Sequence, residues 1–273
     1  MNHVTTLDLQ DEAFSSSPNP RFFYRSLEHY SALNRLEIAI RLKRGLSVIL
    51  GDVGTGKTTL WRTLLKNFEE DEDRYIFHVI LDPAYSTESQ FLLHLAKIFG
   101  VSPVSSTVDC RAQIEEYLFQ KHVVEQKTVV LIIDEGQKLS LASLEILRSL
   151  LNYETNESKM LQLVILAQLE IIPRLQALKN FVDRIAMKYE LKPLDLYETG
   201  QMIFFRLQQT GIATEKTLFS LDAIQRVYEY TQGYPRQIAH VCHYVMEKRF
   251  IGGYSMVTKE LIDQVIAEDR LWK

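Results

Sequence analysis

The first part of the chain alternates short apolar runs with longer segments of helical periodicity. The apolar runs cover 46–50, 75–81, 129–133 and 161–167, and each is almost continuously hydrophobic. Strands that are covered on both faces have this composition, which favours a parallel sheet. A fifth strand is expected at 186–191. Strands that alternate with helices indicate an α/β domain, and the helices are expected over 27–43, 57–69, 87–99, 110–125, 140–152 and 170–180.

This alternation stops near Pro193. Beyond it, only helical segments follow, over 195–210, 220–231, 234–250 and 258–270. The aromatic residues at 22–24 come after a turn-forming Ser/Pro/Asn cluster and are expected to pack against the folded body. We therefore predict three parts: an N-terminal entry segment with its helix over 1–44, an α/β core over 45–193, and an all-helical domain over 194–273.

Composition excludes several classes of protein. The chain has 273 residues, 46% of them hydrophobic, and a net charge of -4, which argues against a disordered protein. Its two cysteines, Cys110 and Cys242, exclude a disulfide framework and a four-cysteine zinc site. His240 and His243 are expected on a different helix face from Cys242, so no zinc site is predicted there. No apolar run reaches the roughly 18 residues of a membrane span, and the first residues lack the features of a signal peptide. We expect no transmembrane segment and a cytoplasmic protein, or one peripheral to the inner membrane.

The strongest motif lies between the first apolar run and the next helical segment. It has the form G-x-x-x-x-G-K-T, from Gly51 to Thr58. Glycines let backbone N–H groups face phosphate oxygens, and the start of the following helix adds its positive dipole. Lys57 would contact the β- and γ-phosphates of ATP, and Thr58 would hold Mg²⁺. The residues expected to bind nucleotide here are Gly51, Asp52, Val53, Gly54, Thr55, Gly56, Lys57, Thr58 and Thr59.

Two carboxylates end the third apolar run. Ligands bind at the carboxyl ends of parallel strands, so Asp134 and Glu135 would stand beside the phosphate loop. We expect Asp134 to bind the metal and Glu135 to orient and polarise the attacking water. With Lys57, these residues predict an ATPase. Asp82 ends the second apolar run; two roles remain open for it, a strand-end cap and a partner that holds Glu135 in an inactive pose.

Four stretches together resemble a known family. They are 17–24, 51–59, 134–137 with 144–148, and 233–236. The sequence resembles AAA+ ATPases and, among them, the ExeA-type ATPases, also called general secretion pathway protein A. It is also similar to ATPases that assist transposition. The resemblance implies a P-loop AAA+ core with a parallel five-stranded sheet and a C-terminal all-helical lid domain.

The resemblance also implies roles for single residues. Gln168 stands where such proteins carry a polar sensor of the γ-phosphate, and Arg236 where they carry a second sensor on the lid. Arg184 matches the arginine finger, which reaches the nucleotide of a neighbouring subunit and acts in catalysis. A surface charge or an ion pair is the alternative for both arginines, and Arg174 is a second candidate for the finger. A finger that acts in trans implies a homo-oligomer, either a ring or a filament.

The biological task stays open between two classes. The first is an oligomeric motor or switch in secretion or pilus-type envelope assembly, with a partner from the envelope. The second is an ATP-dependent regulator that binds duplex DNA. Arg35, Arg41, Lys43 and Arg44 would supply a phosphate-binding stripe in the second class; the alternative for these residues is a solvated helix face.

Overall fold

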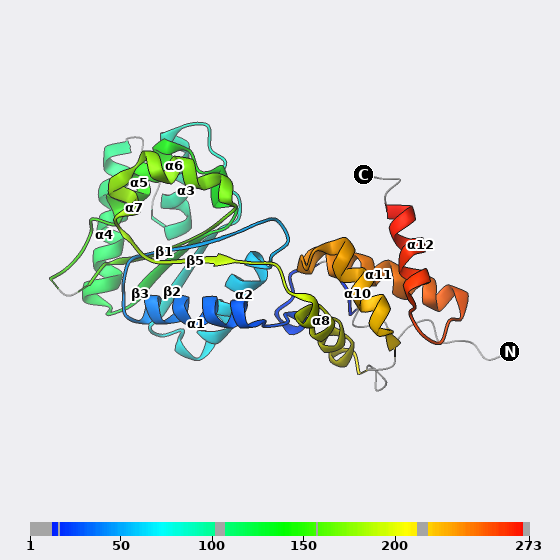
Figure 1. Cartoon of the computed structure of the whole chain (residues 1–273). Coiled ribbons are helices and arrows are strands. Elements are labelled where there is room, and N and C mark those ends of the chain that lie inside the picture. Colours follow the sequence, from blue (N-terminus) through cyan, green and yellow to red (C-terminus); the bar gives the residue numbers. More distant parts are fainter. Residues whose placement is uncertain (1–12, 16, 102–106, 157, 212–217, 270–273) are drawn as a thin grey trace. The chain divides into compact units, whose positions relative to one another are not determined.

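The protein is described by a computed structural model over residues 13–15, 17–101, 107–156, 158–211 and 218–269. Contacts divide the chain into two units (Figure 1). The sheet unit comprises Glu28–Val53 and Leu60–Leu191. The helical unit comprises the described parts of Met1–Leu27, Gly54–Thr59 and Lys192–Lys273. The sequence predicts one entry part over 1–44, whereas the contacts divide that stretch at Leu27.

The sheet unit is built on five strands in the order β2-β3-β4-β1-β5, and every pairing between neighbours is parallel. This confirms the predicted parallel five-stranded sheet. β3 and β4 are buried along their whole length, and β2, at an edge, is only partly covered. The apolar runs of β3 and β4 are continuous because helices cover both faces of these central strands. The strands are β1 Leu46–Gly51, β2 Tyr75–Ile80, β3 Thr128–Ile133, β4 Leu161–Ala167 and β5 Ile185–Leu191.

Helices cover both faces of this sheet. α1 and α2 lie on one face, and α3 to α7 lie on the other (Figure 1). The larger core cluster joins alternate strand residues such as Val129 and Leu163 to Phe91, Ile114 and Leu144 of the second helix group. The helices are α1 Leu27–Arg41, α2 Lys57–Asn67, α3 Glu88–Phe99, α4 Thr107–Phe119, α5 Leu141–Leu150, α6 Ile172–Ala177 and α7 Lys179–Val182.

Two of the predicted helices differ in detail from the structure. The segment 170–180 is divided into η5 Leu169–Ile171, α6 and α7, because Leu178 leaves the helical region at φ -114° and ψ 72°. The segment 110–125 is α-helical only to Phe119 and continues as a π-helical turn, η3 Gln120–Val124. Three further short helices are η1 Pro20–Phe22, η2 Glu69–Asp71 and η4 Gly136–Lys138.

The helical unit has its own hydrophobic core. Asp195 and Glu198 form a capping box at its first long helix. Phe14, from the start of the chain, is buried in this core with its ring edge against Phe219. Arg206 donates to the carbonyls of Ala13 and Ser15, and burial lowers its pKa to about 10. The helices are α8 Leu196–Gln209, α10 Leu221–Thr231, α11 Pro235–Gly252 and α12 Lys259–Asp269.

Phe22 and Phe23 are buried, as expected for the aromatic run, and Tyr24 packs against Phe205 with ring centroids 6.0 Å apart. Within the described ranges, no helix has the combination of length and apolarity that crossing a membrane would need.

Candidate nucleotide-binding site

The glycine-rich loop leaves the end of β1, which lies between β4 and β5. Gly54 and Gly56 have φ values of 84° and 99°, in the region that L-residues with a Cβ rarely enter. α2 begins at Lys57 directly after the loop. The start of a helix carries the positive end of its dipole, which suits a phosphate. Thr55 and Lys57 are buried, Thr58 and Thr59 are half-buried, and Asp52 and Val53 are exposed.

Within the helical unit, the loop is attached to Arg236. The backbone N–H of Arg236 donates to the carbonyl of Gly54 over 3.2 Å. A Cβ at Gly54 would lie 2.9 Å from the Cβ of Arg236, so this position needs glycine for space as well as for φ. Arg236 is the second residue of α11 and its side chain is exposed. Arg236, the predicted second sensor, therefore lies in the first turn of α11, and its backbone contacts the glycine loop.

Asp134 follows the end of β3 and is 4% exposed. Its backbone N–H donates to the carbonyl of Ile80, which extends the strand ladder by one bond. One carboxylate oxygen accepts from the indole N–H of Trp61 over 2.9 Å, and the other accepts from the backbone N–H of Glu135 over 2.9 Å. These bonds fix the direction of the carboxylate. Trp61 is a site residue that the sequence analysis missed; its only signal was an aromatic residue one helical turn after Lys57.

Glu135 has a left-handed backbone, with φ 52° and ψ 35°. A residue other than glycine rarely takes this conformation. One oxygen of Glu135 accepts from the side-chain amide of Gln137 over 2.7 Å. The backbone N–H of Gln168, the residue directly after β4, donates to the same amide over 3.1 Å. The structure therefore brings Glu135 and Gln168 together through Gln137.

Two alternatives raised by the sequence can be compared with the contacts. Asp82 pairs with Lys138 over 3.1 Å and accepts from the backbone N–H of Ala84. These contacts lower the pKa of Asp82 and match the role of a strand-end cap. Arg174 donates to the carbonyls of Gln137 and Leu139, over 2.5 and 2.6 Å. Arg174 therefore supports the backbone after Glu135, which argues against its use as a finger.

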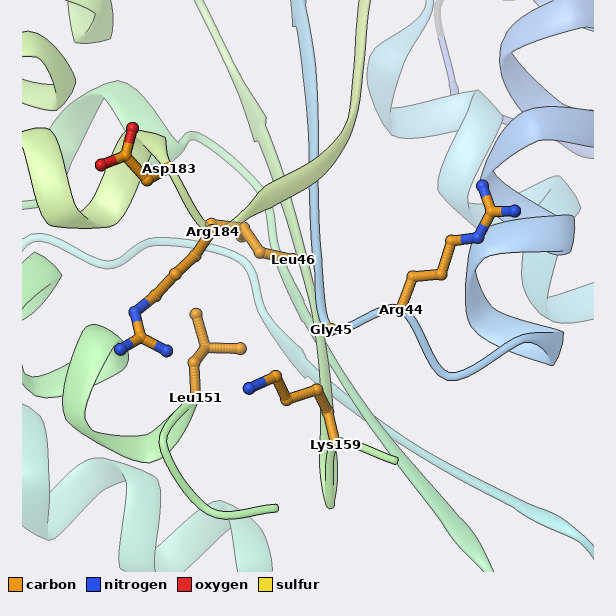
Figure 2. A pocket seen from close by; sticks show the side chains of 7 residues that line it. All are labelled: Arg44, Gly45, Leu46, Leu151, Lys159, Asp183 and Arg184. Carbon is orange, nitrogen blue, oxygen red and sulfur yellow. The ribbon is translucent and has the colours of Figure 1, made fainter. Parts of the chain in front are cut away.

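Arg184 lies at the amino edge of the sheet, where the strands begin, and not at the carboxyl edge with the glycine loop. It comes directly before β5, and with Arg44, Gly45 and Lys159 it lines a cavity of about 270 Å³ beside the start of β1 (Figure 2). The six residues of β1 span about 17 Å, so this cavity is far from the carboxyl edge of the same sheet. The side chains of Arg184 and Lys159 extend toward Leu151, whereas that of Arg44 points away from them (Figure 2).

Two residues of the expected basic stripe, Arg35 and Arg41, make contacts within the protein. Arg41 pairs with Glu37 and Asp71 and lies over the ring of Phe68. Arg35 lies over the ring of Tyr189. These contacts engage two of the four residues within the protein, and they do not decide between a phosphate-binding stripe and a solvated helix face. Among the described residues, no three His, Cys, Asp or Glu side chains lie together in a group that could hold a metal ion.

A family model described as "AAA domain" matches residues 40–175. The chain is 33% identical over 251 residues to General secretion pathway protein A of Aeromonas hydrophila. That match covers 90% of this chain and 44% of the relative, so the chain spans less than half the length of this relative.

Solved structures show the same fold at low sequence identity. The Aeropyrum pernix ORC2 protein, in ADPNP and ADP complexes, matches with a TM-score of 0.68 and 15% identity, over 94% of this chain and 71% of the other. Drosophila ORC bound to DNA matches with a TM-score of 0.67 and 18% identity, over 98% of this chain and 69% of the other. Taken with the parallel sheet and the glycine loop, these matches show that the chain contains an AAA domain, has the fold of the solved structures and is related to General secretion pathway protein A.

Proposed function

We propose that this ATPase binds ATP with Mg²⁺ at the carboxyl edge of its sheet and uses Glu135 to activate the attacking water. The observation that carries the proposal is the placement of Asp134, Glu135 and Gln168. They follow the ends of β3 and β4, and β4 is paired with β1, whose end begins the glycine loop. Ligands bind at such an edge in open α/β sheets.

The donor set fits a magnesium ion. Thr58 offers a hydroxyl and Asp134 a carboxylate, and Mg²⁺ is usually held by one or two such oxygens together with substrate phosphates. The hydrogen bonds from Trp61 and from the Glu135 backbone orient the Asp134 carboxylate. When bound, the ion would neutralise charge on the phosphates.

The protein's own residues would do the rest. Lys57 and the loop N–H groups would hold the β- and γ-phosphates, and Gln168 and Arg236 would contact the γ-phosphate. Glu135 would accept a proton from water as the water oxygen bonds to the γ-phosphorus. The bond from that phosphorus to the oxygen shared with the β-phosphate would break, giving ADP and phosphate.

Glu135→Gln tests this assignment. The variant should still bind ATP but hydrolyse it on the order of 10²-fold more slowly, because the amide cannot accept the proton. Glu116→Gln makes the same change at an exposed position of α4 and is the matched control. Turnover of Glu135→Gln at the rate of the control would show that Glu135 is not the catalytic carboxylate.

We also propose that the active form is a homo-oligomer, a ring or a filament. Arg184 lies at the amino edge of the sheet, where β1 separates it from its own glycine loop. It would therefore serve the nucleotide of a neighbouring subunit.

The proposed biological role is in secretion or pilus-type envelope assembly, with the chain located in the cytoplasm or peripheral to the inner membrane. The support is the similarity to General secretion pathway protein A. The second candidate is an ATP-dependent DNA-binding regulator, and one of the matched structures is of a protein bound to DNA.

Filter binding of duplex DNA, with and without a non-hydrolysable ATP analogue at two salt concentrations, separates the two roles. Submicromolar, ATP-dependent binding that weakens steeply with salt would favour the DNA role, since the slope reports neutralised phosphates. The proposed role in envelope assembly leads us to expect little binding at physiological salt.

A further inference from the structure

Gln137 is a buried polar residue at the end of the stretch 134–137, and none of the roles proposed above involves it. It lies in η4, two residues after Glu135, and is 7% exposed. Its amide nitrogen donates to the Oε2 atom of Glu135 over 2.7 Å, and its amide oxygen accepts from the backbone N–H of Gln168 over 3.1 Å. One side chain therefore connects the carboxylate after β3 to the backbone after β4.

The chemistry of the two partners fixes how this amide is oriented. An ionised carboxylate only accepts hydrogen bonds, and a backbone N–H only donates. The amide nitrogen must therefore face Glu135 and the amide oxygen must face Gln168. The glutamine amide offers the donor and the acceptor that these two partners need.

The backbone of Gln137 has little freedom to move. Its carbonyl accepts from Arg174, and Arg174 also holds the carbonyl of Leu139. On its other side, Gly136 packs closely on β4, where an added Cβ would lie 2.5 Å from Cγ2 of Ile165. A fixed backbone makes the amide a fixed point for the Glu135 carboxylate.

We propose that Gln137 is a positioning residue, which holds the Glu135 carboxylate in a set relation to the end of β4. This inference rests on the proposed role of Glu135. With Oε2 engaged by Gln137, the orientation of the carboxylate toward the attacking water is set before ATP binds. Loss of this contact would leave ATP binding intact and slow the chemical step.

Gln137→Glu is the sharpest test, because it keeps the shape and the acceptor for Gln168 but removes the donor and places two carboxylates together. We expect kcat to fall by about 10- to 100-fold, the scale on which small misplacements of reacting groups act. KM for ATP and the affinity for a non-hydrolysable analogue should change by less than about threefold. Gln264→Glu adds the same charge at an exposed position of α12 and should behave as wild type.

A second variant separates this proposal from loss of folding. Glu135→Gln with Gln137→Glu exchanges the two groups, so that the donor and acceptor face each other again. The exchange should recover the thermal stability that Gln137→Glu loses, without recovering hydrolysis. An unchanged or increased kcat in Gln137→Glu, while Glu135→Gln is inactive, would overturn the role of Gln137 and leave that of Glu135 standing. If Glu135→Gln hydrolyses ATP normally, the proposed function itself fails.

Discussion

The hydrogen bond between Trp61 and Asp134 allows a quantitative test of how the carboxylate proposed to bind the metal is held. Both residues are nearly buried, at 6% and 4% exposed, and the indole nitrogen lies 2.9 Å from Oδ2 of Asp134. A hydrogen bond to a charged group contributes about 1.5–3 kcal/mol. Trp61→Phe removes the donor and part of a buried ring, and the space left adds roughly 1 kcal/mol. We expect the free energy of unfolding to fall by about 2.5–4 kcal/mol.

A double-mutant cycle isolates the hydrogen bond from the lost packing. The variants are Trp61→Phe, Asp134→Ala and the combination of both, unfolded in urea without nucleotide or metal and followed by far-ultraviolet circular dichroism. The combined loss should be smaller than the sum of the single losses by about 1.5–3 kcal/mol. The control pairs Trp61→Phe with Glu116→Ala on the distant α4, for which the losses should add within about 0.5 kcal/mol.

A coupling below about 0.5 kcal/mol between Trp61 and Asp134 would refute the reasoning, since it would equal that of independent sites. The same variant should also alter activity. Because the indole N–H orients Asp134, Trp61→Phe should need several-fold more Mg²⁺ for half-maximal hydrolysis. An unchanged Mg²⁺ dependence would mean that Trp61 contributes to folding alone.

Three further outcomes are expected. Lys57→Ala should abolish tight ATP binding, measured with a fluorescent nucleotide, because the cation that faces the β- and γ-phosphates is lost; near-normal affinity would argue against the phosphate loop. Arg184→Ala should bind ATP but hydrolyse it poorly, and mixing it with Lys57→Ala should recover some activity, since one mixed interface joins an intact pocket to an intact arginine. No recovery in mixed oligomers would argue against action in trans. Burial lowers the pKa of His78 to about 4, so the unfolded state binds more protons between about pH 4 and 6.5 and stability should fall as the pH drops through that range. Unfolding midpoints across this range should show a smaller fall in His78→Gln, and identical slopes in the two proteins would contradict the assignment.

The parts of the site that the sequence predicted depend on local chemistry. The loop needs glycines because positions 54 and 56 have positive φ. A backbone requirement of this kind can be read from the sequence as a pattern of glycines. Asp134 and Glu135 could be placed because a continuous apolar run leads directly to them, and the carboxyl end of a buried strand is where ligands bind.

The parts that the sequence did not predict depend on partners far along the chain. Trp61 and Asp134 are 73 residues apart, and Arg174 and Gln137 are 37 apart. Nothing in the periodicity of either segment identifies its partner. Arg206 is a stronger example of a contact that the sequence does not predict. It donates to the carbonyl of Ala13, 193 residues away, and so connects the segment around Ala13 to α8.

The contact between Gly54 and Arg236 combines a local sequence requirement with a contact between distant residues. The sequence contains the two segments as separate motifs, and the structure joins them by a backbone hydrogen bond that any residue but proline could donate at position 236. The residue type is restricted instead at the two glycine positions, 54 and 233. Gly54 has no room for a Cβ beside Arg236, and at Gly233 a Cβ would lie 1.8 Å from the carbonyl oxygen of Leu194, two residues before α8. Phosphate binding that shifts the loop at Gly54 would therefore act directly on the first turn of α11, and the close fit of Gly233 against Leu194 would carry that shift to α8.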